Sequence, residues 1–366
     1  MAVLAAIPDL AELNRMIARF APAELKVDTS GLAPGDKQAL QKLIEAARVI
    51  DDIFLEQRWS GNRVLRRELA RDQSALGKAQ SHYFEINRGP WSDLDGGTAF
   101  LPKNWGRIEG DAIFQADIPP NKLPGGTFYP EDLTKEEFET WVKGLTPPEQ
   151  EEARGFFTVI RWWPAENGGR RLKTVPYSNE YRVDLPKAAK LLEEAAALTP
   201  NASLKEFLRL RAKAFLDNDY YASDVAWMKL DAPIDITIGP YETYNDDLLG
   251  YKAAFEAYVT LRDDKETAKL GSFAGRMQEI ENNLPLDAKY KNPKIGALAP
   301  IRVVNEVLAT GDGAHGVRTA AFNLPNDERI VKAMGSKRVM LKNIQEAKFA
   351  KTLQPIASRV LSAADQ

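Results

Sequence analysis

Apolar residues recur at helical spacing along the first part of the chain. The earliest of them follow one another at intervals of three and four positions: Leu10, Leu13, Ile17 and Phe20. This spacing places an apolar stripe on one side of a helix, with charged residues on the other side. Because the pattern continues to about residue 85, we predict a mainly helical N-terminal region over residues 1–85.

The pattern changes between residues 86 and 130. Glycine, proline and aromatic residues replace the helical spacing, as in Gly89-Pro90-Trp91. Such clusters predict loops and short extended segments. We therefore place a lobe boundary here and treat residues 86–366 as the second region.

Helices and strands alternate in the second region. Capping boxes predict two helix starts, at Thr134 with Glu137 and at Ser203 with Glu206. Residues 156–163 are rich in β-branched and aromatic side chains, which predict a strand. This mixture indicates an α+β fold that is mainly helical and two-lobed.

A second strand is predicted over residues 234–238, where isoleucines alternate with Asp235 and Thr237. A period of two gives the strand one buried face and one polar face. Apolar residues then repeat at three and four positions over residues 248–259, which predicts a helix. A last long helix is predicted over residues 328–362, kinked near its proline because proline cannot donate the helical hydrogen bond.

Composition excludes several classes of function. A formal net charge of −3 over 366 residues gives no field that would recruit nucleic acid or anionic lipid. The chain has no cysteine, which excludes thiolate nucleophiles and Cys-based zinc sites and fits a reducing compartment. No apolar run approaches the roughly 18–20 residues of a transmembrane helix. We predict a cytoplasmic protein with no nucleic-acid or membrane partner.

The chain has few histidines that could bind a metal, namely His82 and His315. A zinc site needs several imidazole or carboxylate ligands that converge in space. Nothing in the spacing of these two histidines argues for convergence. We predict structural or surface histidines, and we assign no catalytic and no metal-binding residue.

One glycine motif suggests a nucleotide site. Residues 311–316 match G-x-G-x-x-G, which binds a dinucleotide when it follows a strand and opens a helix. Residues 317–325 contain proline and β-branched residues that predict extended chain instead. We therefore reject a nucleotide role.

Two segments resemble one known family. Residues 233–259, which begin P-I-D-I-T-I-G-P-Y-E-T-Y, resemble the substrate-strand region of the dipeptidyl peptidase III family, which are zinc metallopeptidases. Residues 316–328 resemble the family loop in which asparagines and an acidic residue bind the N-terminus and backbone of the substrate. The resemblance spans roughly residues 120–360 and is closest to the shorter bacterial zinc-dependent hydrolases. It implies a small β-core lobe beside a helical lobe.

The resemblance implies a set of substrate-binding residues. Asn323 and Asn326 match the family asparagines, and Thr237 stands where the family carries a tyrosine that helps stabilise the tetrahedral intermediate. That departure argues against strict dipeptidyl peptidase activity. The full set combines both segments with an earlier aromatic motif: Asp235, Thr237, Glu242, Asn323, Asn326, Glu328 and Phe100.

These residues suggest how a peptide would bind. If the strand at 234–238 lies at a sheet edge, it can accept an extended peptide by β-addition. The two asparagines would hold the peptide backbone and its terminus. The glutamates would supply negative charge for an α-amino group.

The catalytic motif of the family is the missing part. The family holds zinc with an H-E-x-x-x-H or H-E-x-x-H helix, and neither pattern occurs in this chain. We expect the N-terminal, substrate-binding portion of such a hydrolase, inactive alone, with zinc only in the complete family protein. Its ligands would be short peptides or other small substrates. An exposed apolar patch on the C-terminal helix would bind a zinc lobe or a second copy of the chain. A non-catalytic scaffold protein and a split enzyme completed by a second chain are the alternatives.

Overall fold

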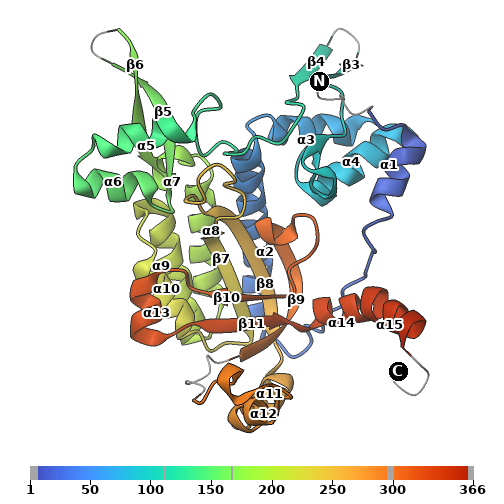
Figure 1. Cartoon of the computed structure of the whole chain (residues 1–366), viewed down its shortest axis with the longest axis vertical. Coiled ribbons are helices and arrows are strands. Elements are labelled where there is room, and N and C mark those ends of the chain that lie inside the picture. Colours follow the sequence, from blue (N-terminus) through green and yellow to red (C-terminus); the bar gives the residue numbers. More distant parts are fainter. Residues whose placement is uncertain (1–6, 110–111, 166–167, 295–300, 362–366) are drawn as a thin grey trace.

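The computed structural model of the chain describes residues 7–109, 112–165, 168–294 and 301–361 (Figure 1). The first elements are helices, followed by short strands that pair as β1 with β2 and β3 with β4. Their bounds are α1 (Leu10–Ile17), α2 (Pro34–Arg58), α3 (Asn62–Arg71), α4 (Ala75–Asn87), β1 (Trp91–Ser92), β2 (Thr98–Ala99), β3 (Asn104–Glu109) and β4 (Ala112–Asp117). All the elements described up to residue 87 are therefore helices.

A mainly helical middle section follows, interrupted by one hairpin of β5 and β6. Its elements are α5 (Lys135–Lys143), α6 (Pro147–Arg154), β5 (Thr158–Pro164), β6 (Arg170–Pro176), α7 (Tyr177–Glu180), α8 (Leu185–Leu198), α9 (Ala202–Asp217) and α10 (Tyr221–Met228).

The last section contains the main sheet. Its elements are β7 (Ile234–Glu242), β8 (Ala254–Arg262), α11 (Asp264–Ala274), α12 (Met277–Asn283), β9 (Ile301–Gly311), β10 (Ala321–Leu324), α13 (Glu328–Met334), β11 (Lys337–Leu341), α14 (Lys342–Lys348), a π-helical turn (Phe349–Leu353) and α15 (Gln354–Val360). The strand order is β10-β11-β9-β8-β7, antiparallel except between β11 and β9. The α+β prediction is confirmed.

Both faces of this sheet are covered. On the isoleucine face, Phe255 of β8 packs against Tyr177 and Phe215, and the Thr310 hydroxyl donates to the carbonyl of Ala47 in α2. On the other face, Phe322 of β10 stacks on Tyr258 of β8 with ring centroids 4.6 Å apart. Figure 1 shows α2 and α8 behind β7–β9, and β10 and β11 crossing in front of them. The sheet therefore bends back across its own polar face.

Burial on both faces explains one wrong prediction. Residues 248–259 do not form a helix; β8 begins at Ala254, and most of it is buried on either side. A strand with two buried faces carries apolar residues at odd and even positions, so its spacing resembles that of a helix.

The predicted long helix over residues 328–362 is also wrong. Strand β11 interrupts it after Gly335, whose φ of 76° ends α13 in a conformation that favours glycine. Pro355 lies in the first turn of α15, directly after the π-helical turn. Helical turns continue without a break from Lys342 to Val360, so the missing N–H of this proline falls inside that run, next to the π-helical turn.

The two predicted capping boxes have different outcomes. Thr134 and Glu137 cap each other at the start of α5, as predicted. Helix α9 begins earlier than predicted, because Asn201 is its cap and accepts from the N–H of Leu204 at 2.9 Å. The Ser203 hydroxyl instead donates to Asn201 Oδ1 and to the carbonyl of Asp231.

Apolar side chains form two clusters. The N-terminal core includes Trp59, Trp91 and Phe100, and it extends as far as Ile118. The β-core includes the sheet, α8, α9 and most of α2. The lobe division at residue 86 stays a prediction, while the packing joins β1–β4 to the N-terminal helices and α2 to both cores.

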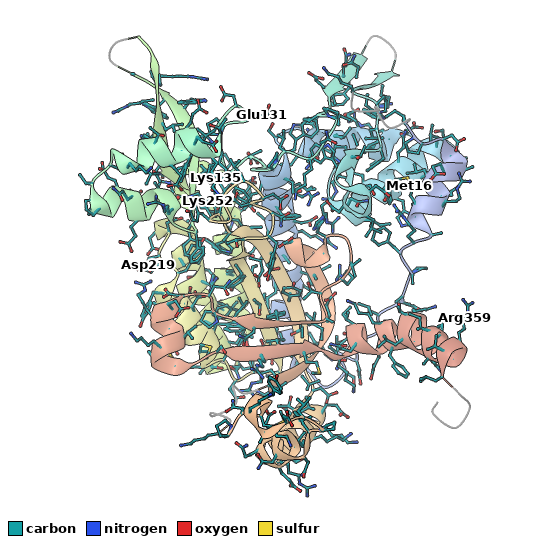
Figure 2. All side chains as sticks on the ribbon, viewed as in Figure 1. Met16, Glu131, Lys135, Asp219, Lys252 and Arg359 are labelled. Atoms are coloured by element: carbon teal, nitrogen blue, oxygen red, sulfur yellow. The ribbon has the colours of Figure 1, made fainter. Side chains whose placement is uncertain are left out.

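A buried lysine links the middle section to the sheet. Lys252 (labelled in Figure 2) is 0% exposed, and its Nζ donates to Ala153 O at 2.6 Å, Gly155 O at 2.9 Å and Thr158 Oγ1 at 2.7 Å. None of these acceptors carries a charge, and burial lowers the pKa of Lys252 to about 7. The folded chain therefore releases this proton more readily than the unfolded chain does.

This shift predicts a pH dependence. Above about pH 7 the unfolded chain binds more protons at Lys252, so the free energy of unfolding should rise with pH up to the ordinary lysine range. The slope of the unaltered chain should exceed that of Lys252→Met by up to about 1.4 kcal/mol per pH unit. Urea unfolding of both chains from pH 7 to pH 10 measures the difference. Equal slopes would contradict the prediction.

Candidate functional site

Strand β10 presents an open edge. It ends the strand order and pairs with β11 alone. The N–H of Leu341 donates to Ala320 O at 3.0 Å, so by antiparallel alternation Phe322 and Leu324 bond to β11. Ala321 and Asn323, both exposed, then direct their backbone N–H and C=O groups away from the sheet. This edge can accept an added strand.

Strand β7, at the other end of the order, is closed. Its residues from Ile234 to Tyr241 are buried, and Arg211 Nη1 donates to Ile238 O at 2.9 Å on the outer edge. β7 is an edge strand, but β-addition to it is excluded in this structure because its residues are buried and Arg211 of α9 occupies an outer carbonyl. The open edge belongs to β10.

Two of the predicted binding residues lie inside the fold. Asp235 and Thr237 are 2% and 1% exposed. Asp235 Oδ2 lies 3.7 Å from the Nζ of buried Lys337, and the Thr237 hydroxyl accepts from the indole N–H of Trp227 at 3.1 Å. They point away from the isoleucine face as predicted, but β11 and α10 cover them, so neither reaches a ligand at the surface.

The loop after β10 joins the end of β7. Asn326 Nδ2 donates to Tyr241 O at 2.9 Å, which places this loop beside Glu242. Asn323 and Glu328 are exposed in the same segment. Asp327, not Asn326, caps α13, so the Asn326 side chain is not used as a helix cap. The structure thus places Asn326 beside Glu242, with Asn323 and Glu328 in the same chain segment.

Acidic groups gather behind Glu242. Burial, and then the charge of Asp312, raise the pKa of Glu242. Glu256 is 2% exposed, and burial together with Asp312 and Glu242 raises its pKa well above the ordinary value. This negative potential suits a cationic group, because a cation would offset the repulsion between the carboxylates.

A network holds Asp312 in place, and the sequence pattern contained no signal for it. Asn245 Nδ2 donates to Asp312 Oδ1 at 2.7 Å, and buried Arg58 donates to Asn245 Oδ1 at 3.2 Å. Arg58 Nη1 also lies 2.8 Å from His315 Nε2, which contacts the Asp93 carboxylate. Burial opposes ionisation of Asp93, but the hydrogen bond with His315 and the Arg58 charge hold its pKa well below the usual range.

Phe100 and His82 lie apart from this site. Phe100 is 1% exposed in the N-terminal core, edge-on to Tyr83 with centroids 4.8 Å apart. His82 is exposed on α4, while His315 belongs to the Arg58 network. Within the residues that the structure describes, no three His, Cys, Asp or Glu side chains are placed to hold a metal ion. None of the described helices is long and apolar enough to cross a membrane.

A family model and two solved structures point to the same family. Residues 167–363, more than half of the chain, match the model of peptidase family M49. The structure of dipeptidyl-peptidase III from Corallococcus sp. strain EGB is 52% identical with a TM-score of 0.84, covering 98% of this chain and 63% of that one. The structure of DPP III from Caldithrix abyssi is 46% identical with a TM-score of 0.84, covering 96% and 63%.

A curated relative is named differently. Nudix hydrolase 3 from Arabidopsis thaliana is 41% identical over 384 residues, which cover 96% of this chain and 49% of that protein. The chain thus spans about half the length of this curated relative and 63% of each solved chain.

Proposed function

This chain belongs to peptidase family M49, and on that premise we propose that it is the peptide-binding portion of a dipeptidyl-peptidase III-like hydrolase. The resemblance of residues 233–259 and 316–328 to that family is confirmed. Beyond family membership, we propose which ligand the chain binds and where it binds. A cytoplasmic location is part of the same proposal.

The open edge of β10 carries the proposal. A peptide that adds there would form main-chain hydrogen bonds with Ala321 and Asn323, which direct their backbone groups outward. Asn323 and Asn326 would bind its terminus, and Glu242 with Glu328 would attract the α-amino group. Asp235, Thr237 and Phe100 would act from inside the fold by supporting the strands and the N-terminal core.

The zinc of this family does not fit the described residues. They contain no cluster of three potential ligands, and the two histidines have separate surroundings. We therefore derive no catalytic step in this chain. The proposal assigns zinc and catalysis to another segment of a complete family protein.

This assignment predicts the metal content of the chain. After dialysis against zinc-free buffer, zinc measured by atomic emission should stay far below one ion per chain, because the described residues hold no set of ligands for it. A content near one ion per chain would show a site that the described residues do not reveal.

An exposed apolar stripe on the π-helical turn and α15 suggests that this surface binds a partner. Four large apolar side chains follow at helical intervals through the π-helical turn and α15, each between 53% and 72% exposed: Phe349, Leu353, Ile356 and Val360. Such a stripe is typical of an interaction site. We propose that it packs against a zinc-carrying segment of the family. Self-association, or a role as a non-catalytic scaffold, is the alternative, and sedimentation with and without Leu353→Glu would measure self-association.

A titration tests peptide binding directly. The amidated tetrapeptide Val-Tyr-Thr-Val should bind weakly, about millimolar, near −4 kcal/mol. Amide shifts in NMR spectra should change over residues 321–328 and around Glu242. Shifts confined to other surfaces, or no shifts at high peptide concentration, would contradict the proposed function.

A further inference from the structure

A large cavity lies next to the N-terminal end of β10. Its volume is about 690 Å³, within the range of about 300–1,000 Å³ that ligand sites occupy. β9, α14 and the extended segment before α2 form its walls, with apolar lining from Phe20, Leu25, Val307, Leu308 and Ile344. The loop of Gly316, Val317 and Arg318 closes the side nearest β10.

Most charged groups around the cavity are paired. Arg318 forms an ion pair with buried Glu306. Arg19 pairs with Asp95, and Arg88 pairs with Asp51 and Glu85.

The remaining charge is positive. Lys348 and Lys351 also line the cavity, and within the part of the chain that the structure describes neither ammonium group has a hydrogen-bond or ion-pair partner. Among the described residues that line the cavity, Glu306 carries the only carboxylate. Arg318 is its counter-charge, and burial raises its pKa. The cavity therefore combines an apolar wall with an unbalanced positive rim.

The cavity and the acidic groups lie at opposite ends of β10. Arg318 precedes Ala321 by three residues, so the cavity meets the beginning of the strand. Asn326, bonded to Tyr241, places Glu242 at the end of the strand. A peptide lying along β10 thus meets negative charge at one end and positive charge at the other.

We propose that this cavity receives the acidic carboxyl-terminal part of a peptide that lies antiparallel to β10, so that peptides with anionic residues after an apolar stretch are the preferred ligands. The inference rests on the proposed function, because the peptide must first add to β10. The α-amino group then lies toward Glu242, and the acidic residues lie toward Lys348 and Lys351. Six residues in a strand span about 17–20 Å at about 3.3 Å each, enough to pass beyond the four residues of β10.

Two matched peptides test the charge preference. Amidated Val-Tyr-Thr-Val-Glu-Glu should bind at least about tenfold more tightly than Val-Tyr-Thr-Val-Lys-Lys at low salt. Added salt should reduce the ratio, since exposed charges are screened. The double variant Lys348→Glu with Lys351→Glu should reverse the order of the two affinities.

A control variant with the same change of net charge separates an effect of the cavity from an effect of the overall charge. Lys190→Glu with Lys265→Glu reverses two exposed lysines away from the cavity and should leave the ratio unchanged. Lys348→Ala with Lys351→Ala should remove the preference without reversing it. Circular dichroism and thermal unfolding of each variant confirm that it folds.

The outcomes separate this inference from the proposed function. Equal affinities for both peptides, or a preference that survives the Lys348 and Lys351 reversal, would overturn the inference. If Val-Tyr-Thr-Val still shifted the amides of β10 in that case, the proposed function would stand. If no peptide bound, both would fail.

Discussion

Replacing Arg211 with methionine is expected to lower the free energy of unfolding by about 3–5 kcal/mol. Arg211 is 0% exposed; its guanidinium forms an ion pair with Asp224 and donates to Ile238 O. It also lies over the rings of Tyr220 and Tyr241, 5.3 and 5.5 Å from their centroids. Methionine would leave the Asp224 carboxylate buried without its partner, and that uncompensated charge is the main cost.

Chemical denaturation measures this effect. Arg209→Met, on the same helix, is the matched control, because Arg209 is 59% exposed and makes only a distant contact with Glu193. The control should change stability by less than about 0.5 kcal/mol. Adding Asp224→Asn to Arg211→Met should restore part of the loss. If Arg211→Met lowered the free energy of unfolding by less than about 1 kcal/mol, the Arg211–Asp224 ion pair would not have the stabilising role expected here.

Arg211 also decides which edge of the sheet is open. Its bond to Ile238 O occupies an outward-facing carbonyl of β7, and Gly239 leaves the space that the guanidinium needs, because a Cβ there would lie 2.3 Å from Arg211 Nη1. Closure of β7 by this side chain leaves β10 as the edge where a peptide can add.

Removing both asparagines is expected to weaken peptide binding by at least about tenfold. Asn323→Ala removes an exposed amide beside the outward backbone groups of β10. Asn326→Ala breaks the bond to Tyr241 O that fixes the loop against β7. Each loss corresponds to about 0.5–1.5 kcal/mol of hydrogen bonding, so the pair should have a measurable effect on a weak ligand.

The affinity of amidated Val-Tyr-Thr-Val, followed by NMR, is the measurement for this pair. Asn283→Ala with Asn292→Ala is a control at exposed positions away from β10 and should leave the affinity unchanged. Unaltered binding by Asn323→Ala with Asn326→Ala would show that these side chains do not bind the peptide. Binding through the main chain of β10 would then need its own test.

Part of this account could be predicted from the sequence. Alternation over residues 234–238 correctly predicts β7, because its isoleucine face is apolar and its other face is polar. The same method fails for β8, where burial on both faces removes the period of two. It also fails for β11, a short strand between two helices whose apolar residues fit a helical pattern equally well.

The candidate site divides in the same way. The loop with Asn323 and Asn326 could be recognised by its resemblance to the family loop, because such a motif is local in sequence. The burial of Asp235 and Thr237 was not, because it depends on β10 and β11 folding back over β7 and β8. The Arg58, Asn245 and Asp312 network combines residues from distant parts of the chain, and no local spacing indicates it.

The most direct test of peptide addition to β10 uses two backbone-methylated peptides. Amidated Val-Tyr-Thr-Val is methylated either at the tyrosine nitrogen or at the threonine nitrogen. Each peptide therefore lacks one of two neighbouring N–H groups. Because successive N–H groups of a strand face opposite sides, we expect one methylated peptide to bind like the parent. The other should bind at least about tenfold more weakly and lose the amide shifts at Ala321 and Asn323. Equal affinities of the two methylated peptides would contradict binding by β-addition at β10.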